Sequence, residues 1–437
     1  MLIVFATLTL LQIEHPVQER TLTLEKAISL ALERNPAIHI QTRQVERADI
    51  EKKLGDGLRL PTLSSSASSL FRSSDGRLSQ GAGHAEAWGN TLALDLSWAL
   101  FTGYEHTSQK QIFELSHRLQ SEVLVTEVEN LIYQVSAAFF DIVKQKNMLG
   151  VSEENLEVSR ERLQKARLRQ ELGQSSNTEL LDAEVAFQND EAVTAGRIEA
   201  LENSYSTLKA LLFLEPEEQL RVMGTIPVFE DLPDLGVLLT EMESRHPQLN
   251  QLDLNRQMAA EATKIAKSGY YPRLSLNSGL SYNLNNNDFR GLSGDTHYRL
   301  GSVGLVMSYS LFDGHRRKVN LATAKINESQ VQTRYSQALN QLKLNVSNLY
   351  KQLKLQKNRL NLQVQIEQRT RQYLTLQKER FQMGTIDSLT FRDAQLRLSR
   401  ASQALIAIKH QHALTYLNLM KSSGRLRAWN ENQQLLK

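Results

Sequence analysis

Hydrophobic and polar residues alternate strictly in several short stretches of the chain. From Leu274 to Leu284 every second residue is Leu or Tyr, apart from Ser278, and the residues between them are Ser, Asn or Gly. Such alternation is typical of a strand with one apolar face and one polar face. The pattern recurs three times, most weakly in a serine-rich stretch. We therefore expect two pairs of strands, at about 61–73 with 90–101 and at about 272–284 with 301–312, each pair joined by a polar loop.

Beyond each strand pair the hydrophobic period changes from two residues to three and a half. From Leu124, and again from Tyr335, apolar residues follow at alternating steps of four and three, which is the spacing of a coiled coil. Proline is absent from both regions and glycine is nearly absent, as a long helix requires. We expect helices over about 103–171 and 314–382, each near 100 Å long at about 1.5 Å per residue.

Glycines mark both ends of these long helices. Gly103 and Gly314 stand at the predicted strand-to-helix transitions, and Gly173 and Gly384 stand where the helices are expected to end. A second helix follows each of the latter, at about 177–213 and 388–422, and a shorter helix precedes each strand pair. The sequence thus predicts, in each half, a strand pair that continues into an antiparallel pair of helices.

The two halves are copies of each other. Leu100-Phe101-Thr102-Gly103 returns as Leu311-Phe312-Asp313-Gly314, and Asp182-Ala183 returns as Asp393-Ala394, both after 211 residues. A constant offset indicates a tandem duplication. We assign 1–20 as a candidate signal segment, since Leu2–Leu11 is apolar although it lacks a basic start. The first repeat is 21–213, a proline-rich connecting or belt segment is 214–235, the second repeat is 236–423, and the C-terminal tail is 424–437.

Composition excludes several classes of protein. The 437 residues contain 51 Lys and Arg against 48 Asp and Glu, so no basic surface for a nucleic acid is expected. The absence of cysteine excludes disulfides, thiolate catalysis and cysteine-based metal sites. No apolar run is long enough for a membrane-spanning helix. The ten histidines are scattered and no catalytic motif occurs, so we predict no enzymatic activity, no cofactor and no metal site.

Four strands with one apolar face cannot close a barrel alone, because the smallest bacterial outer-membrane barrels have about 8 strands. An open sheet of this kind would also expose its edges, which proteins avoid. Closure by several chains solves both problems. Three chains, giving a barrel of about 12 strands, fit best, because 8-stranded barrels are filled by side chains. The strands also have the length that a tilted strand needs to cross a bilayer.

The chain resembles the TolC family of outer-membrane efflux and secretion ducts over nearly its whole length. The resemblance is carried by the tandem repeat, by the opening Leu-Thr-Leu-Glu-Lys-Ala (22–27), by Pro-Arg-Leu-Ser-Leu (272–276), by Leu-Phe-Asp-Gly-His-Arg-Arg (311–317) and by the two glycine turns. It implies a mainly α fold with a membrane β-barrel portion. Specifically, a homotrimer would form a 12-stranded barrel in the outer membrane, in contact with its lipid, and an α-helical tunnel in the periplasm. The duct would be coupled to an inner-membrane transporter through a periplasmic adaptor.

By the same resemblance, the two glycine turns lie at the periplasmic end of the tunnel, where the family places acidic residues that constrict the aperture and select cations. Gly173 and Gly384 would then be tips for adaptor docking. Asp393 and Glu179 fall at acidic positions of the family, whereas another usual aspartate position is Thr390 here and the gating arginine position is Ile386. The candidate aperture residues are Asp393, Glu179, Asp387, Asp182 and Thr390. Asp387 is equally well explained as a helix cap, and the other acids as solvated.

Two functions remain open from the residues. The main prediction is a passive outer-membrane channel of a tripartite efflux or type I secretion system. The alternative is a soluble coiled-coil structural or adaptor protein, which would have no use for four alternating strands. The sequence does not distinguish drugs, metals or secreted proteins as cargo, because the pump selects the cargo.

Overall fold

The structure is a computed structural model that describes residues 20–78, 81–173, 176–289 and 292–429. The candidate signal segment therefore lies outside the described residues, except for Arg20. The chain forms two compact units. We call them the helical unit (to Ile40, 125–247 and from Asn340) and the strand unit (41–124 and 248–339). Each unit contains parts of both repeats, so the boundary runs across the two longest helices rather than between the two copies.

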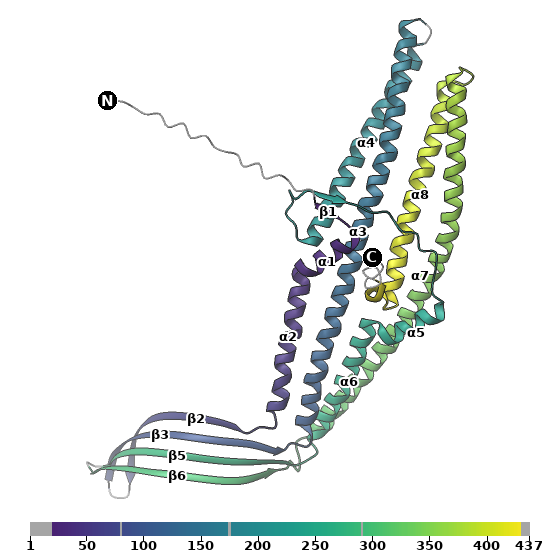
Figure 1. The fold of residues 1–437 in the computed structure, drawn as a ribbon. Helices are drawn as coiled ribbons and strands as arrows, with labels where there is room; N and C mark the ends of the chain where they lie inside the picture. The colour runs from purple at the N-terminus through teal and green to yellow at the C-terminus, as the bar shows by residue number, and fades with distance from the viewer. Residues whose placement is uncertain (1–19, 79–80, 174–175, 290–291, 430–437) are drawn as a thin grey trace, which may run out of the picture. The chain divides into compact units, whose positions relative to one another are not determined.

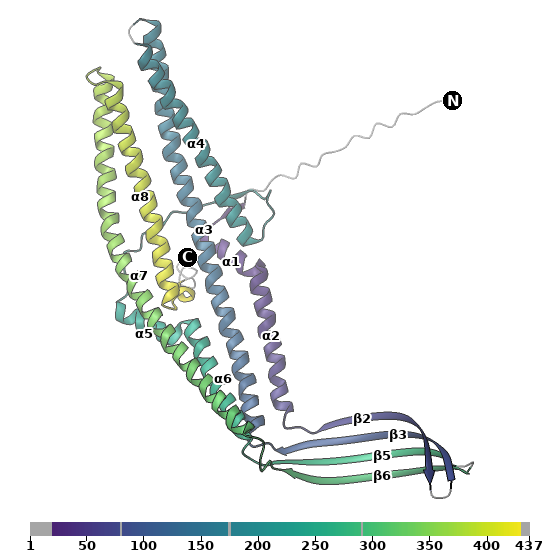
Figure 2. The ribbon, with the colours of Figure 1, turned by 180° about the vertical axis from the view of Figure 1, so that it is seen from behind.

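The strand unit contains one antiparallel sheet with the strand order β2-β3-β5-β6. The four strands run side by side in both views of the chain (Figures 1 and 2). Their bounds are Thr62–Leu78, Gly81–Phe101, Arg273–Phe289 and Leu292–Ser308. Within this sheet, β2 and β6 are the edge strands, and the outer edge of each has no partner strand in the described part of the chain.

All four strands extend further toward their hairpins than the alternating pattern predicts. Residues such as Asn285 and Asn286 are polar on both faces of the sheet, so the alternation disappears although the ladder continues. At its other end β6 stops at Ser308 instead of 312. Leu311 and Phe312 lie beyond the strand with 88% and 77% of their surfaces exposed.

The cross-strand register places the alternating apolar residues on one face of the sheet. Leu94 pairs with Leu280, and Leu276 pairs with both Trp98 and Leu305. Directly paired residues point to the same side of a sheet. This apolar face consists of Leu63, Ala67, Phe71, Trp88, Leu92, Leu94, Leu96, Trp98, Leu274, Leu276, Leu280, Tyr282, Leu284, Val303, Leu305 and Met307. Many of its side chains are exposed, up to 76% at Val303.

The opposite face of the sheet is polar and forms its own hydrogen bonds. The Thr91 hydroxyl donates to the Asn283 amide oxygen at 2.8 Å, and the Ser97 hydroxyl donates to that of Asn277 at 3.1 Å. The sheet thus presents an apolar side and a wet side, as the sequence pattern predicts.

The two long helices are α3 (Glu105–Glu171) and α7 (Arg316–Gln382), each of 67 residues. Helix α4 (Asn177–Leu212) returns beside α3, and α8 (Ser388–Ser422) returns beside α7 (Figures 1 and 2). The remaining helices are α1 (Leu24–Arg34), α2 (Pro36–Gly57), α5 (Leu235–Arg245) and α6 (Pro247–Ser268). Across the described residues, no helix is both long and apolar enough to span a membrane.

The core of the helical unit follows the predicted coiled-coil positions. Val135 and Ile142 of α3, and Val346 and Leu353 of α7, are completely buried. Each large apolar side chain that is buried stabilises the folded state by about 1.5–3 kcal/mol, and this packing accounts for most of the stability of such long helices. The isolated propensity of a helix contributes much less.

The segment between the repeats crosses the helical unit. Its residues Leu220–Val222 form β4, which pairs in parallel with β1 (Arg20–Leu22). Further on, the ring of Phe229 stacks on Tyr416 of α8 at 3.8 Å between centroids, and Lys357 Nζ donates to the Glu230 carbonyl at 2.7 Å. This segment therefore joins the first repeat to helices of the second.

Both strand-to-helix transitions use left-handed backbone. Gly103 and Gly314 have φ of +66° and +65°, and each is followed by a non-glycine residue that is also left-handed, Tyr104 or His315. The two glycines differ in their surroundings. A Cβ at Gly103 would lie 2.7 Å from the Ser268 carbonyl oxygen, whereas a Cβ at Gly314 would meet nothing within 4 Å.

Candidate functional site

The site predicted from the sequence is the end of the helical unit where α3 meets α4 and α7 meets α8. Gly173 and Gly384 end the long helices with φ of +69° and +73°. Their backbone N–H groups donate to Gln170 and Phe381 carbonyls at 2.9 and 3.1 Å, which is how a left-handed residue caps the end of a helix. Open space surrounds both glycines, so φ rather than packing selects glycine here.

Asp387 is the N-cap of α8. Its carboxylate accepts a hydrogen bond from the Thr390 backbone N–H at 2.8 Å. Hydrogen bonds from Thr390, through its side chain and then its backbone, hold the pKa of Asp387 below its ordinary value. Capping of the helix is therefore sufficient to explain an aspartate at this position. Thr390 donates its backbone N–H to this cap and is itself exposed.

Asp393 lies one and a half turns into α8 and is exposed. Its carboxylate accepts a hydrogen bond from Arg397 Nε at 2.6 Å, and the two side chains retain 52% and 62% of their exposure. The bond to Asp393 raises the pKa of Arg397. A solvent-exposed pair of this kind holds its partners weakly, so the Asp393 carboxylate stays available to other cations.

Glu179 and Asp182 lie in the first turns of α4. A Glu179 carboxylate oxygen is 3.7 Å from an Arg169 guanidinium nitrogen on α3, and the Glu179 backbone N–H donates to the Ser176 hydroxyl at 3.3 Å. Asp182 is exposed. Both carboxylates act electrostatically on Arg162 of α3. Two predicted aperture residues near the Gly173 turn thus act on the same arginine. Arg162 was not identified from the sequence as a residue of this site.

Arg162 is 92% buried and connects α3 to the start of α8. Its Nε donates to the Ser388 hydroxyl, next to the Asp387 cap. Burial lowers the pKa of Arg162, with repulsion from Arg392 as a smaller cause, while Asp182, Glu179 and Asp190 oppose the shift. The charge of Arg162 therefore lies among three carboxylates and one further arginine.

A second buried contact joins α4 to α8. Both terminal nitrogens of Arg392 donate to the Asp190 carboxylate at 2.8 Å, and each side chain is only 12% exposed. A two-point contact of this kind fixes orientation as well as distance. Sequence reasoning missed this pair. The signal that could have found it is a break in the repeat, since Asp190 corresponds to Ala401 and Arg392 to Leu181.

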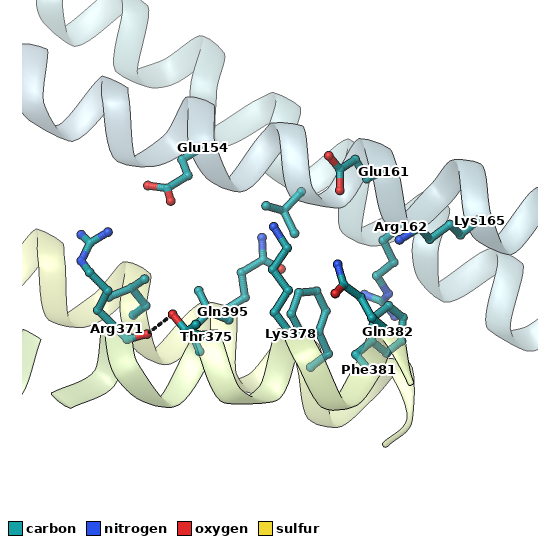
Figure 3. A pocket seen from close by; sticks show the side chains of 14 residues that line it. Glu154, Glu161, Arg162, Lys165, Arg371, Thr375, Lys378, Phe381, Gln382 and Gln395 are labelled. Atoms are coloured by element: carbon teal, nitrogen blue, oxygen red, sulfur yellow. Dashed lines mark hydrogen bonds between the residues drawn. The ribbon is translucent and has the colours of Figure 1, made fainter. Parts of the chain in front are cut away.

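A cavity of about 360 Å³ lies between α3 and the α7–α8 pair (Figure 3). Glu154, Glu161 and Arg162 reach it from α3, and Arg371 and Lys378 from α7. The stacked rings of Phe381 and Phe391, 4.9 Å apart, form part of its wall. This end of the helical unit is therefore a joint between two helical pairs, with a cavity that charged side chains line.

Comparison with known proteins agrees with this architecture. The family model described as "Outer membrane efflux protein" matches residues 27–212 and 238–425, two segments that begin 211 residues apart. "Outer membrane protein TolC" of Vibrio cholerae is 23% identical over 346 residues, which cover 77% of each chain. The protein of the same name from Escherichia coli is 21% identical over 318 residues, covering 70% of this chain and 64% of that one.

Solved structures share the fold. The outer-membrane channel OprN matches with a TM-score of 0.78 at 19% identity, covering 92% of this chain and 89% of that one. The CmeC outer membrane channel of Campylobacter jejuni matches with a TM-score of 0.80 at 16% identity, covering 92% and 86%.

Proposed function

The chain belongs to the outer membrane efflux protein family and is an outer-membrane channel, and from this premise we propose that three copies of it assemble into one passive duct. The alternative of a soluble coiled-coil structural or adaptor protein does not fit the family, whose members are channels rather than enzymes or soluble scaffolds. The duct would lead from the periplasm to the exterior.

The observation that supports a trimer is the unfinished sheet of the strand unit. Its apolar face is exposed, and the outer edges of β2 and β6 have no partner strand among the residues that the structure describes. A closed barrel would pair every edge and give the apolar face to lipid. Three chains of four strands give a lumen wide enough for passage, whereas two chains would give a barrel filled by its own side chains.

The helical unit supports a periplasmic role. Its helix-turn ends at Gly173 and Gly384 would be the tips on which a periplasmic adaptor docks, and the adaptor would link the duct to an inner-membrane transporter. The segment 214–235 and the tail 424–437 would form a belt around the helices, for which the packing of Phe229 on Tyr416 is the support. Residues 430–437 of that tail lie outside the described residues.

For the aperture we propose Asp393 as the principal residue. It is exposed and its partner Arg397 is exposed too, so three copies could meet at a narrow mouth. Glu179, Asp182 and Thr390 would contribute polar groups nearby. Asp387 would contribute least, because its carboxylate already caps α8.

The trimer can be tested with engineered cysteines, because the chain has none of its own. Ser302→Cys on β6 would be combined in turn with Ser64→Cys, Ser66→Cys or Ser68→Cys on β2. Within one chain these edges are three strand spacings apart, about 14 Å, too far for a disulfide. Oxidation of outer membranes should therefore give a covalent three-chain species for the pair that is in register.

The single-cysteine variants are the matched controls and should remain single chains on a denaturing gel. The proposal would be overturned if no pair gave a three-chain species and the detergent-extracted protein had the mass of one chain.

A further inference from the structure

The apolar face of the sheet carries a groove of about 590 Å³. Side chains of Ala67, Leu92, Leu94 and Leu280 line it, and these residues come from three neighbouring strands that the register places on the same face. The groove lies on the side opposite the polar face, so it is outside the path that cargo would take through a barrel. An apolar groove on the outside of a membrane sheet faces hydrocarbon chains.

One cation also lines this groove. Arg299 pairs with Tyr282 across β5 and β6, which puts it on the apolar face, and its guanidinium carbon lies 5.8 Å above the Tyr282 ring centroid. The residue is exposed. Within the described parts of the chain no ion pair joins it to a carboxylate, in contrast to arginines such as Arg392 and Arg397 of the helical unit. An arginine without a carboxylate partner at the edge of a lipid-facing surface carries a charge that complements an anionic neighbour from outside the chain.

The depth of Arg299 agrees with a headgroup. The strand ends near Leu274 adjoin the helices, which are periplasmic in this family, so the hairpin ends face the exterior. Tyr282 lies eight residues from Leu274, about 26 Å along the strand at ~3.3 Å per residue. At a tilt of about 40° this is ~20 Å of depth, close to the top of an apolar band of about 25 Å. Trp88 and Phe71, with rings 4.8 Å apart, lie still nearer the hairpins, as an aromatic girdle would.

We propose that this groove and Arg299 form a binding site for a phosphate-bearing lipid of the outer leaflet. The acyl chains would lie along the leucines and the headgroup phosphate would bind the guanidinium, which matches phosphate with two parallel N–H donors. The ring of Tyr282 holds the guanidinium at the mouth of the groove. This inference rests on the placement of the sheet in the outer membrane.

Native mass spectrometry of the detergent-extracted full-length protein tests the site, with bisphosphorylated lipid A as the probe. Arg299→Gln should reduce the number of bound lipids per assembly about fivefold or more, because the charge-assisted bonds to phosphate are lost. Arg299→Lys keeps the charge but loses the two parallel donors, so it should bind more lipid than Arg299→Gln and less than the wild type, which separates the loss of charge from any loss of folding. Enzymatic removal of both phosphates from the lipid should reduce binding to the wild-type protein as strongly.

Arg72→Gln is the matched control, because Arg72 lies next to Phe71 on β2 and so points to the opposite face. It should leave lipid binding unchanged. Equal binding by wild type and Arg299→Gln, or equal losses in both glutamine variants, would overturn the site. Displacement of the lipid by millimolar inorganic phosphate would overturn the lipid as occupant. If Arg299→Gln forms the three-chain species and still binds lipid as the wild type does, this site is refuted and the trimer is not. If the wild-type protein itself forms no three-chain species, the trimer is refuted.

Discussion

At the scale of single residues, Asp393 is the clearest candidate for control of ion passage. Three copies at a narrow mouth would attract cations, and a multivalent cation could bridge them. Asp393→Ala should therefore lower cation selectivity and weaken block by divalent or trivalent ions several-fold in planar-bilayer recordings. Arg397→Gln should strengthen the block, because it removes the cation that now binds the Asp393 carboxylate.

Glu379→Gln is a suitable control, since it removes another exposed carboxylate close to the same turn. If Asp393→Ala and Arg397→Gln both leave selectivity and block unchanged, Asp393 is an ordinary solvated aspartate of α8.

His246 gives a pH-dependent contribution to stability. Burial, with repulsion from Lys421 as the smaller cause, lowers the pKa of His246 to about 4. Between that value and its ordinary pKa near 6.5 the unfolded chain binds more protons, so the stabilisation is complete above pH ~6.5 and is lost as the pH falls toward 4. At about 1.4 kcal/mol per pKa unit, the loss is on the order of 3 kcal/mol.

The first repeat supplies the variant that tests this contribution. Asn35 corresponds to His246, and its side-chain oxygen accepts a hydrogen bond from the Ala37 N–H at 2.9 Å. His246→Asn should keep the stability at pH 7 and flatten its decline between pH 6.5 and 4, measured by urea unfolding of the helical signal. A remaining slope is expected, because burial also lowers the pKa of His410 and His412. Identical slopes in both proteins would contradict the prediction.

At the scale of elements, the two strand-to-helix transitions offer a matched comparison. Alanine at either Gly103 or Gly314 must adopt left-handed backbone, which costs about 1–2 kcal/mol. At Gly103 the new methyl group would also collide with the Ser268 carbonyl and with Tyr271. Gly103→Ala should therefore lower the temperature at which the assembled species dissociates clearly more than Gly314→Ala, as followed by heating before electrophoresis. Equal shifts would mean that the Ser268 contact relaxes without cost.

The elements also show how far the sequence could be interpreted. The alternation around Leu280 and the four–three steps from Leu124 predict strands and long helices because these signals are local. The short helices α1 and α5 were not predicted, although the side chains of Thr23 and Asp234 cap them by accepting hydrogen bonds from the backbone N–H groups of Lys26 and Gly236. They are only 11 residues long, and short helices depend on tertiary packing for their stability.

The buried contacts of the helix-turn end could not be predicted in the same way. Asp190 and Arg392 are 202 residues apart, and each is an ordinary charged residue within its own helix. Only the packing of α4 near α8 makes them partners. The duplication offers one signal, because their counterparts in the other repeat are uncharged, but this signal does not show that the two residues contact each other. The same holds for Ser388. In the sequence it is an ordinary serine at the start of a helix, and only the packing of α3 near α8 makes its hydroxyl accept a hydrogen bond from Arg162.

At the scale of the whole molecule, the apolar face predicts that an arginine is tolerated less well on one side of a strand than on the other. An arginine at the bilayer midplane of a barrel costs about 2–4 kcal/mol, and much less where the side chain faces the lumen. Leu280→Arg should thus reduce the yield of the membrane-assembled species far more than Ser281→Arg. Quantification of the three-chain species in outer membranes measures this difference. Similar yields for the two variants would show that the apolar face does not contact lipid.

The unpaired edges of β2 and β6 also have a genetic consequence. Because neither edge has a partner strand among the described residues of its own chain, each copy in the proposed trimer would depend on two others to complete its sheet. In a cell that makes equal amounts of a normal and an edge-defective chain, random mixing in threes leaves only about one assembly in eight free of the defective chain. An allele that damages one edge strand, for example with a proline in β6, should therefore act dominantly over the normal allele, whereas a null allele that produces no chain should be recessive.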